Sequence, residues 1–484
     1  MDVKKLEQLR RMLNLKTGAE LGSRKADPDT PPDSSSGSGS PKKLSQKTAA
    51  ETDKNTEERQ LLRKRMRAIL GVGQENSVRT VQEETVNASA EICGELEGNI
   101  IRNKNGSFLL VRREFPVEWR HGTYPLGAVL HCSPQTAAWI SGDLTLSDMN
   151  WRETLFLDTE TTGLAGGAGT VCFLIGIGKF ISESVFRLDQ CFMRDFDDEG
   201  AMLTYLDSEY PAPSALVSYN GKSFDLPLLR NRHVQHRLDF PWKHTPHFDL
   251  VHSVRRIWKR RLEDCGLANV ERLLLGVTRT GDVPSSLIPR IWLDFITRGD
   301  PRPLRPVFYH HRVDILSMVT LAGCLSRMLE DEAGRSFEEA EDRVSLLRQC
   351  IKKRDYERAV QVAEAMLHEE DFAEVLGEVH ELRCTALRRL KRASEYMDAL
   401  WAWHRACPTD LRAAYFLAGV MANARNLAAA RQVCEETLEK VESAGSFYRD
   451  MAIQPDRLKL EDRLRHIRAR MGSDDSDGSG QDLW

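Results

Sequence analysis

The ten cysteines of this 484-residue chain include no C-x-x-C pair and follow no regular spacing. Structural zinc sites and disulfide frameworks need closely and regularly spaced cysteines, so neither kind of cross-link is predicted. Several cysteines stand in apolar surroundings, among them Cys172, Cys191, Cys324 and Cys350. They are typical of reduced, packed thiols in a cytosolic protein.

Long hydrophobic runs and a surplus of positive charge are also missing. No stretch is apolar over the length that a membrane-spanning helix needs, and the N-terminus lacks the apolar region of a signal peptide. We therefore expect a soluble, cytoplasmic protein without a membrane partner. The formal net charge is −4, so binding to nucleic acid would have to depend on local basic patches.

Residues 22–59 lack aromatic side chains and contain one large aliphatic residue, Leu44. Such a segment cannot bury enough apolar surface to fold. We expect residues 1–75 to be mostly disordered with short basic helices, and residues 471–484 to form a disordered acidic tail. The remaining length suggests more than one folded domain.

A pair of carboxylates stands at the end of a strand-like run. Asp158 and Glu160 follow the apolar residues 154–157. Because residues i and i+2 of a strand point to the same face, both side chains can project to one side of a sheet. Converging carboxylate oxygens favour Mg²⁺ or Mn²⁺. Two such ions about 3.5–4 Å apart promote the cleavage of phosphodiesters.

Two later motifs add further carboxylates. Asp225 follows a short apolar run and an Asn-Gly pair, which places it at the start of a predicted helix. Asp314 lies in a stretch whose apolar spacing is helical, and His310 precedes it by four residues. Residues i and i+4 of a helix share a face. Four carboxylates in the order Asp, Glu, Asp, Asp, with a histidine beside the last, predict one metal-binding constellation.

With these motifs the chain resembles the DEDD superfamily of 3′–5′ exonucleases, and within it the YprB-like branch. The resemblance covers roughly residues 95–330 and is carried by Asp158-x-Glu160-Thr-Thr-Gly163 and Asn220-Gly-x-x-Phe224-Asp225. It implies a ribonuclease-H-like fold and hydrolysis of terminal phosphodiester bonds. It implies two Mg²⁺ or Mn²⁺ ions held by Asp158, Glu160, Asp225 and Asp314. It also implies substrate contacts from Thr161, Gly163, Leu164, Asn220 and Phe224.

The third motif departs from the commonest family pattern. Many members place a histidine five residues before the last aspartate, or a tyrosine four before. Here Tyr309 is five before and His310 is four before, and His311 stands where the YprB-like branch has an asparagine. We expect His310 to be the catalytic residue that assists the attacking water, because histidine side chains exchange protons near neutral pH. Tyr309 is the alternative.

The order of predicted elements fits a mixed sheet with flanking helices. We expect strands at 154–158, 171–180, 184–193 and 215–219, and helices at about 197–209, 224–236 and 308–329. The Asn105-Gly106 pair predicts a hairpin that precedes this core. These elements define a predicted α/β exonuclease domain at 90–332 with an N-terminal β extension.

A basic segment at 254–261 is the candidate grip on a single strand. Its cations and its aromatic residue are Arg255, Arg256, Trp258, Lys259 and Arg260. Trp258 could stack on a base while the cations meet phosphates. Alternatively, Ile257 and Trp258 belong to a core and the cations are solvated. A second basic cluster comprises Arg63, Lys64, Arg65 and Arg67.

The chain becomes helical and loosely repetitive beyond residue 333. Ala359, Ala399 and Ala430 mark three similar segments at intervals of 40 and 31 residues. These intervals straddle the 34 residues of a tetratricopeptide repeat, so we expect such repeats at 337–470. A plain helical bundle is the alternative. Stacked helix pairs would offer a surface to a protein partner.

Together these patterns predict a divalent-metal-dependent 3′–5′ exonuclease acting on single-stranded DNA or RNA ends. A non-catalytic adaptor, in which a ribonuclease-H-like module is joined to helical repeats, is the main alternative. Four converging charges argue against it, because a scaffold has no need of them. An endonuclease or structure-specific nuclease is a further alternative. The choice between DNA and RNA stays open at this point.

Overall fold

The computed structural model describes residues 90–163, 169–444 and 454–474. Among them, the chain divides into two compact units. The first comprises residues 90–138, 143–250 and 270–324, and the second comprises 139–142, 251–269 and 325–474. The region predicted to be disordered at 1–75, with its basic cluster, lies outside the described residues, as does the tail beyond Asp474.

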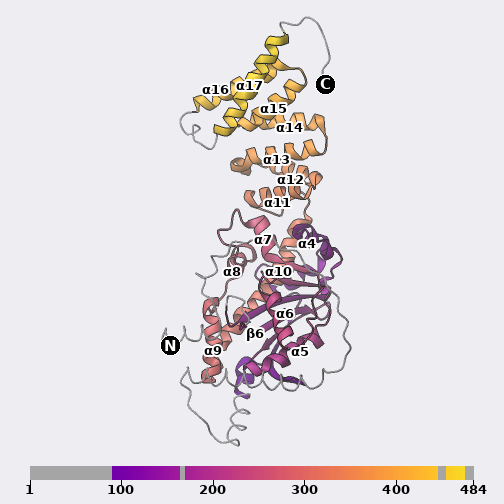
Figure 1. Ribbon diagram of the computed structural model, residues 1–484, viewed down its shortest axis with the longest axis vertical. Coiled ribbons are helices and arrows are strands. Elements are labelled where there is room, and N and C mark those ends of the chain that lie inside the picture. The colour runs from indigo at the N-terminus through magenta and orange to yellow at the C-terminus, as the bar shows by residue number, and fades with distance from the viewer. Residues whose placement is uncertain (1–89, 164–168, 445–453, 475–484) are drawn as a thin grey trace, which may run out of the picture. The chain divides into compact units, whose positions relative to one another are not determined.

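The described part of the first unit is built on a mixed sheet of seven strands (Figure 1). In spatial order they are β1 (Asn99–Asn103), β2 (Gly106–Pro116), β7 (Val185–Phe192), β6 (Cys172–Phe180), β5 (Thr154–Thr161), β8 (Ala215–Ser218) and β9 (His247–Asp249). Neighbours from β1 to β5 are antiparallel, whereas β5, β8 and β9 are parallel. The predicted hairpin forms and extends the sheet through β7.

Helices flank this sheet, and the predicted fold class is therefore confirmed. They are α5 (Glu199–Glu209), α6 (Asp225–Gln235), α9 (Ile288–Arg298) and α10 (Arg305–Glu330). Two shorter helices, α4 (Pro134–Ser141) and α8 (Leu267–Val270), contain residues of both units. A small ribbon joins β3 (Arg120–His121) to β4 (Tyr124–Pro125). The boundary between the two units falls inside α10, after Cys324.

Two glycines of β6 bring helix α10 close to the sheet. A methyl group placed on Gly176 would lie 2.2 Å from Cδ1 of Ile315 and 2.4 Å from Cε1 of His311, both on α10. One placed on Gly178 would lie 2.9 Å from Cγ2 of Ile315. Alternate residues of a strand point to opposite faces, so Ile175 points the other way, into the hydrophobic core. Gly176 also pairs with Asp158 across β5 and β6, so the same glycine sets the distance between α10 and the strand that carries the first carboxylates.

Gly176→Ala should therefore destabilise the first unit. The added methyl must displace His311 or the end of Ile315, and overpacking of this kind costs about 1–3 kcal/mol. Urea unfolding followed by circular dichroism measures the change. Gly94→Ala is the matched control, because a methyl there meets nothing within 4 Å. Equal stability of the two variants would contradict this account of α10 packing.

The second unit is helical. Its helices are α7 (Leu250–Trp258), α11 (Ala340–Lys353), α12 (Tyr356–Leu367), α13 (Leu376–Arg389), α14 (Ala393–Ala406), α15 (Leu411–Asn423), α16 (Leu427–Ser443) and α17 (Gln454–Asp474). The expected acidic tail thus begins within α17. Residues 251–269 group with this unit, although the predicted boundary at 332 places them in the other.

The three similar sequence segments are the second helices of three helix pairs. In each pair the turn contains a residue with positive φ: Arg354 at 63°, Lys391 at 61° and Arg425 at 61°. The marking alanines, Ala359, Ala399 and Ala430, are fully buried in α12, α14 and α16. The repetition in the sequence is thus a repetition of helix pairs, and the assignment to tetratricopeptide repeats stays a prediction.

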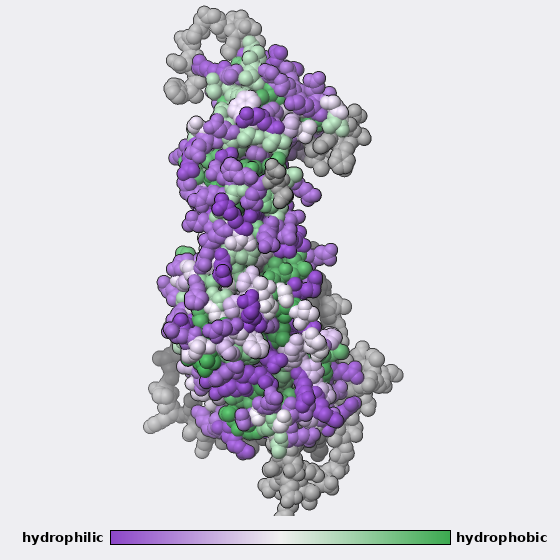
Figure 2. Space-filling model, turned by 180° about the vertical axis from the view of Figure 1, so that it is seen from behind, coloured by the Kyte–Doolittle hydropathy of each residue, from purple (hydrophilic) through white to green (hydrophobic). Residues whose placement is uncertain are grey.

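Hydrophilic side chains cover most of the face shown in Figure 2, and hydrophobic side chains form smaller patches between them. Within the described ranges, none of the helices has the length and apolar character needed to cross a membrane.

Candidate metal centre

The first two carboxylates lie on strand β5, where it passes from the core to the surface. Residues 154–157 are buried, whereas Asp158 and Glu160 are half-buried. The strand is longer than predicted because its pairing with β6 continues to Thr161, with an irregular register after Glu160. Asp158 and Glu160 are therefore two residues apart on one regular strand and point to the same face.

Asp225 reaches the same region from the start of α6. The turn before it needs special backbone: Asn220 has a φ of 71°, a conformation that asparagine tolerates better than most residues. A methyl group on Gly221 would lie 2.5 Å from Oγ of Ser218. The Asn-Gly pair in the sequence is thus required by this turn. The turn directs Asp225 toward β5, where its carboxylate accepts a hydrogen bond from the Thr159 hydroxyl.

Asp249, at the end of β9, stabilises this turn through hydrogen bonds to its backbone. Its carboxylate accepts hydrogen bonds from the backbone N–H groups of Asn220, at 2.7 Å, and Lys222, at 3.0 Å. The sequence analysis missed both β9 and Asp249. A three-residue strand carries too short a pattern to be read, and a single aspartate after it has no distinguishing neighbour.

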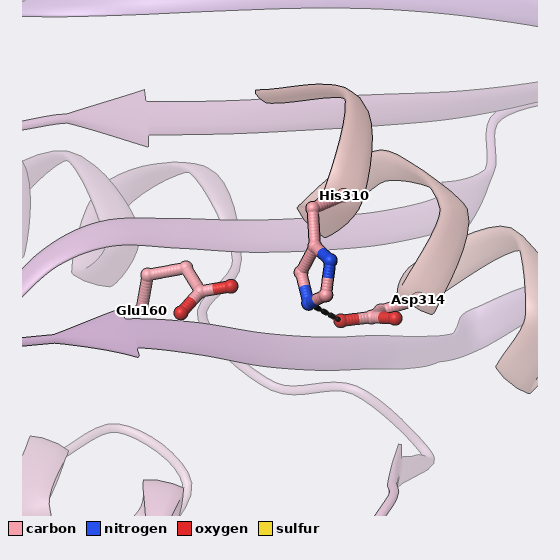
Figure 3. A group of neighbouring side chains, drawn as sticks. All are labelled: Glu160, His310 and Asp314. Carbon is pink, nitrogen blue, oxygen red and sulfur yellow. Dashed lines mark ion pairs between the residues drawn. The ribbon is translucent and has the colours of Figure 1, made fainter. Parts of the chain in front are cut away.

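Helix α10 supplies the remaining two side chains. In Figure 3, His310 and Asp314 come from α10 and lie beside Glu160 of β5. One ligand atom from each of these three residues can be chosen so that all three atoms lie within 4.8 Å of one another. Nε2 of His310 is 3.4 Å from Oδ2 of Asp314. Strand and helix thus meet with their acidic side chains turned toward one point.

The four carboxylates act on one another electrostatically. Burial, followed by the charges of Asp314, Asp225 and Glu160, raises the pKa of Asp158 well above its ordinary value. Burial and the neighbouring charges of Asp314 and Asp225 do the same to the pKa of Glu160. Burial raises the pKa of Asp225 to about 6. Such a cluster is costly unless positive charge offsets it.

This donor set suits hard divalent cations. Carboxylate oxygens are the ligands that Mg²⁺ and Mn²⁺ prefer, and the Glu160 side chain forms no hydrogen bond or ion pair within the part of the chain that the structure describes. Asp158, Glu160, Asp225 and Asp314 are therefore the residues that would hold the ions. The ligand atoms of Glu160, His310 and Asp314 lie within 4.8 Å of one another, whereas Asp158 and Asp225 act on this group through their charges.

Arg279 is a cation in this cluster that the sequence analysis missed. Its guanidinium pairs with Asp314 and, at 2.6 Å through both Nε and Nη2, with the buried Glu271. A further contact of 3.2 Å joins it to Asp282. Arg279 and Asp282 lie in an irregular segment between α8 and α9. No periodic pattern marks that segment, so the sequence gives no signal for it.

His310 has charged neighbours at both ring nitrogens. Nδ1 lies 2.8 Å from Oδ1 of Asp282 and 3.1 Å from Nη1 of Arg279. With the proton on Nδ1, the ring donates to Asp282 and Nε2 can accept; with the proton on Nε2, Nδ1 accepts from Arg279. Although burial raises it, hydrogen bonding and the charge of His310 hold the pKa of Asp282 below its ordinary value. Nε2 is also 3.3 Å from the hydroxyl of Ser285.

His311 has a different role from its neighbour. It is fully buried, and burial lowers its pKa to about 4. Its Nδ1 accepts a hydrogen bond from the Gln190 side chain at 3.1 Å. Its Nε2 then donates to the backbone carbonyl of Asp158 at 3.2 Å. A neutral His311 thus ties α10 to β5 directly behind the first carboxylate.

The residues expected to contact substrate surround this centre to different degrees. The Thr161 hydroxyl donates to the backbone carbonyl of Gly163 at 2.9 Å, which shapes the end of β5. Phe224 is 55% exposed and immediately precedes Asp225. Asn220 contributes its backbone to the turn described above. Leu164 lies outside the described residues.

The predicted stacking of Trp258 on a base is wrong, because this side chain is fully buried and packs against Phe337. Ile257 is also buried. Arg256 donates to the backbone carbonyl of Ile140 at 2.9 Å, and Arg260 pairs with Glu378 at 3.0 Å. Arg255 and Lys259 are exposed. The segment thus follows the alternative interpretation, in which its apolar residues are core and its cations serve the protein surface.

Adding Mg²⁺ or Mn²⁺ to chelator-treated protein should raise its melting temperature. The ions offset the mutual repulsion of the carboxylates, and a ligand at 100 times its Kd stabilises a protein by about 2.7 kcal/mol. Asp158→Asn should respond less and should melt no lower than wild type in chelator, because it removes a desolvated charge. Differential scanning fluorimetry at constant ionic strength measures both. An equal response of wild type and variant would place the ions elsewhere.

Comparisons with known proteins agree with this geometry. Residues 155–326 match the model of the RNase H superfamily. Over 239 residues the chain is 34% identical to the "Uncharacterized protein YprB" of Bacillus subtilis (strain 168). That match covers 48% of this chain and 57% of the relative, so the chain spans little more than half of the relative's length. The chain thus carries a domain similar to the RNase H superfamily, with all four carboxylates inside it, and is similar to YprB.

Proposed function

We propose that this protein is a divalent-metal-dependent 3′–5′ exonuclease that hydrolyses terminal phosphodiester bonds of single-stranded DNA or RNA. The observation that carries the proposal is the approach of Glu160 from β5 to His310 and Asp314 from α10, with Asp158 and Asp225 close enough for their charges to act on the same carboxylates. The similarity of residues 155–326 to the RNase H superfamily supports phosphodiester chemistry at this position.

Two divalent cations bound there would activate a water molecule and stabilise the charge on the leaving oxygen. His310 accepts a proton from that water at Nε2, and Asp282 holds the ring with Nδ1 protonated. Phe224, exposed beside Asp225, offers its ring to the terminal base.

Tyr309 fits the role of proton acceptor less well than His310. Its hydroxyl accepts a hydrogen bond from the backbone N–H of Thr280 at 3.2 Å, and its ring lies 5.4 Å from the guanidinium of Arg312. Neither contact belongs to the carboxylate cluster. These contacts support the assignment of the proton transfer to His310.

A cleavage assay tests the proposal directly. Purified protein is incubated with Mg²⁺ or Mn²⁺ and with 5′-labelled single strands of DNA and of RNA, and the products are separated by size. A 3′–5′ exonuclease produces a ladder that shortens from the 3′ end and releases mononucleotides. Single internal cuts would indicate an endonuclease. No cleavage of either polymer, by protein that binds the metal ions, would favour the adaptor.

A further inference from the structure

A groove of the first unit is lined by two segments of the chain that also contribute residues to the metal centre. Its main hollow has a volume of about 620 Å³ and continues into a second hollow of about 300 Å³. The two share Arg113, Tyr309 and Arg312. The walls come from the end of β2, from the turn that follows it, from residues 276–278 and from α10. None of these segments belongs to the candidate grip at 254–261.

The groove and the metal centre share two segments of the chain. On α10, Tyr309 lines the groove and His310 faces the carboxylates. In the irregular segment, Thr278 lines the groove and Arg279 pairs with Asp314. In each of the two segments, one residue lines the groove and the next one along the chain contacts the carboxylates. The same two segments therefore separate the groove from the metal centre.

The groove carries positive charge that is not matched by carboxylates. Arg112 binds the buried Asp189 at 2.7 Å, Arg113 pairs with Glu97 at 2.8 Å, and Glu114 pairs with Arg187 at 3.1 Å. Within each of these three pairs, the positive and the negative charge neutralise each other. In the second hollow Arg305 pairs with Glu95 at 2.6 Å. The remaining two guanidinium groups that line the groove, those of Arg120 and Arg312, form no ion pair within the described residues.

Arg312 in particular lacks an anion. Its guanidinium lies over the ring of Tyr309 instead of beside a carboxylate. An anionic ligand beside this guanidinium would supply the missing negative charge. Phosphate is suited to the task because its oxygens match the planar donors of a guanidinium.

Aromatic rings accompany these cations. Trp119 is 50% exposed, and its ring lies 5.6 Å from that of Phe115, edge to face. Tyr309 adds a third ring to the same groove. Valine and leucine side chains, Val313 and Leu316, contribute apolar surface between them. Basic grooves that also contain aromatic side chains are how proteins hold single-stranded nucleic acid without regard to sequence.

We propose that this groove binds single-stranded nucleic acid, with Arg120 and Arg312 on its phosphates and Trp119 on a base, beside the carboxylates that cleave its end. The last clause rests on the proposed function, whereas strand binding itself does not. The exposed ring favours a nucleic acid over an acidic peptide, which would use the cations but would have no base to stack.

Binding is measured with the Asp158→Asn protein in chelator, so that no strand is cut. Fluorescence anisotropy with a labelled single strand of about 12 nucleotides is recorded at several salt concentrations. Each phosphate contact contributes about −0.7 to the slope of log affinity against log salt. Arg120→Ser with Arg312→Ser should therefore weaken binding and flatten the slope by about 1.4. Arg120→Ser alone should give about half of that change.

Trp119→Ala should weaken binding by about 5- to 100-fold and leave the slope unchanged, because stacking involves no counterion. The matched control removes two exposed cations of the second unit, Arg255→Ser with Lys259→Ser. It carries the same change in net charge and should bind as tightly as its parent. Circular dichroism melting verifies that each variant is folded.

Three outcomes would overturn the proposal. In the first, the groove variants bind the strand as tightly as their parent. In the second, only the control variant loses affinity, which would place the strand-binding site on the second unit. In the third, polyglutamate displaces the strand and Trp119→Ala has no effect, which would indicate an acidic protein ligand. Failure of the proposed function looks different: the groove variants lose strand binding as expected, but the wild-type protein with metal ions cuts no strand.

Discussion

Replacing Asp158 with asparagine should reduce strand cleavage by about 10³-fold or more while the protein stays folded. The substitution keeps the shape of the side chain and removes its charge. Asp158 stands in the field of three other carboxylates, and a metal ligand there supports several kcal/mol of charge stabilisation in the transition state. Each 1.36 kcal/mol corresponds to a factor of ten in rate. Asp225→Asn should act in the same way.

Initial rates on a labelled single strand, with Mg²⁺ and with Mn²⁺, measure this effect. Glu183→Gln is the matched control, since its side chain is 90% exposed in a turn and pairs only loosely, at 3.5 Å, with Arg152. It should retain the wild-type rate. Near-native turnover by either aspartate variant would mean that the metal ions are held by other residues and that the site assignment is incorrect.

Replacing His310 with glutamine should lower kcat by about 10²- to 10⁴-fold, the usual contribution of a positioned acid–base group. Glutamine keeps a polar side chain of similar reach but cannot take up a proton. The melting response to Mg²⁺ should persist, because the four carboxylates are intact. Asp282→Asn should give a smaller loss of the same kind, since it weakens the hydrogen bond that fixes the ring.

Tyr309→Phe is the comparison for His310. It removes the hydroxyl that contacts the backbone of Thr280 and leaves the ring in place, so kcat should change little. Single-turnover rates with saturating protein separate chemistry from strand binding. A large loss of kcat in Tyr309→Phe, together with a small loss in His310→Gln, would assign the role of proton acceptor to Tyr309.

The carboxylate motifs could be predicted from the sequence because their geometry is local. Asp158 and Glu160 share a strand face, and His310 and Asp314 share a helix face, so spacing alone relates each pair. The positions of four strands along the chain and the hairpin at Asn105-Gly106 followed from turn and alternation signals in the same way. These are contacts that a short stretch of chain makes with itself.

The parts that could not be predicted are contacts between distant segments. Asp249 supports the turn before Asp225 from a three-residue strand, and Arg279 reaches Asp314 from a segment without periodicity. The opposite error occurred at Trp258, where a basic neighbourhood suggested a surface role for a residue that is buried against Phe337. Burial depends on what packs above a helix, which the spacing of its own residues does not specify.

Arg279 and a divalent cation would compete for the same carboxylate, that of Asp314. Anchored on the buried Glu271, its guanidinium already lies against Asp314, so an arriving divalent cation finds part of the negative charge taken. A divalent cation bound there would replace the Arg279 guanidinium as the positive partner of Asp314, and its affinity would be the difference between the two attractions. Removing the resident cation would tighten the grip on metal while leaving an empty cluster under greater repulsion. We therefore expect the metal affinity to be low, so that the occupancy of the site depends on the concentration of free ions.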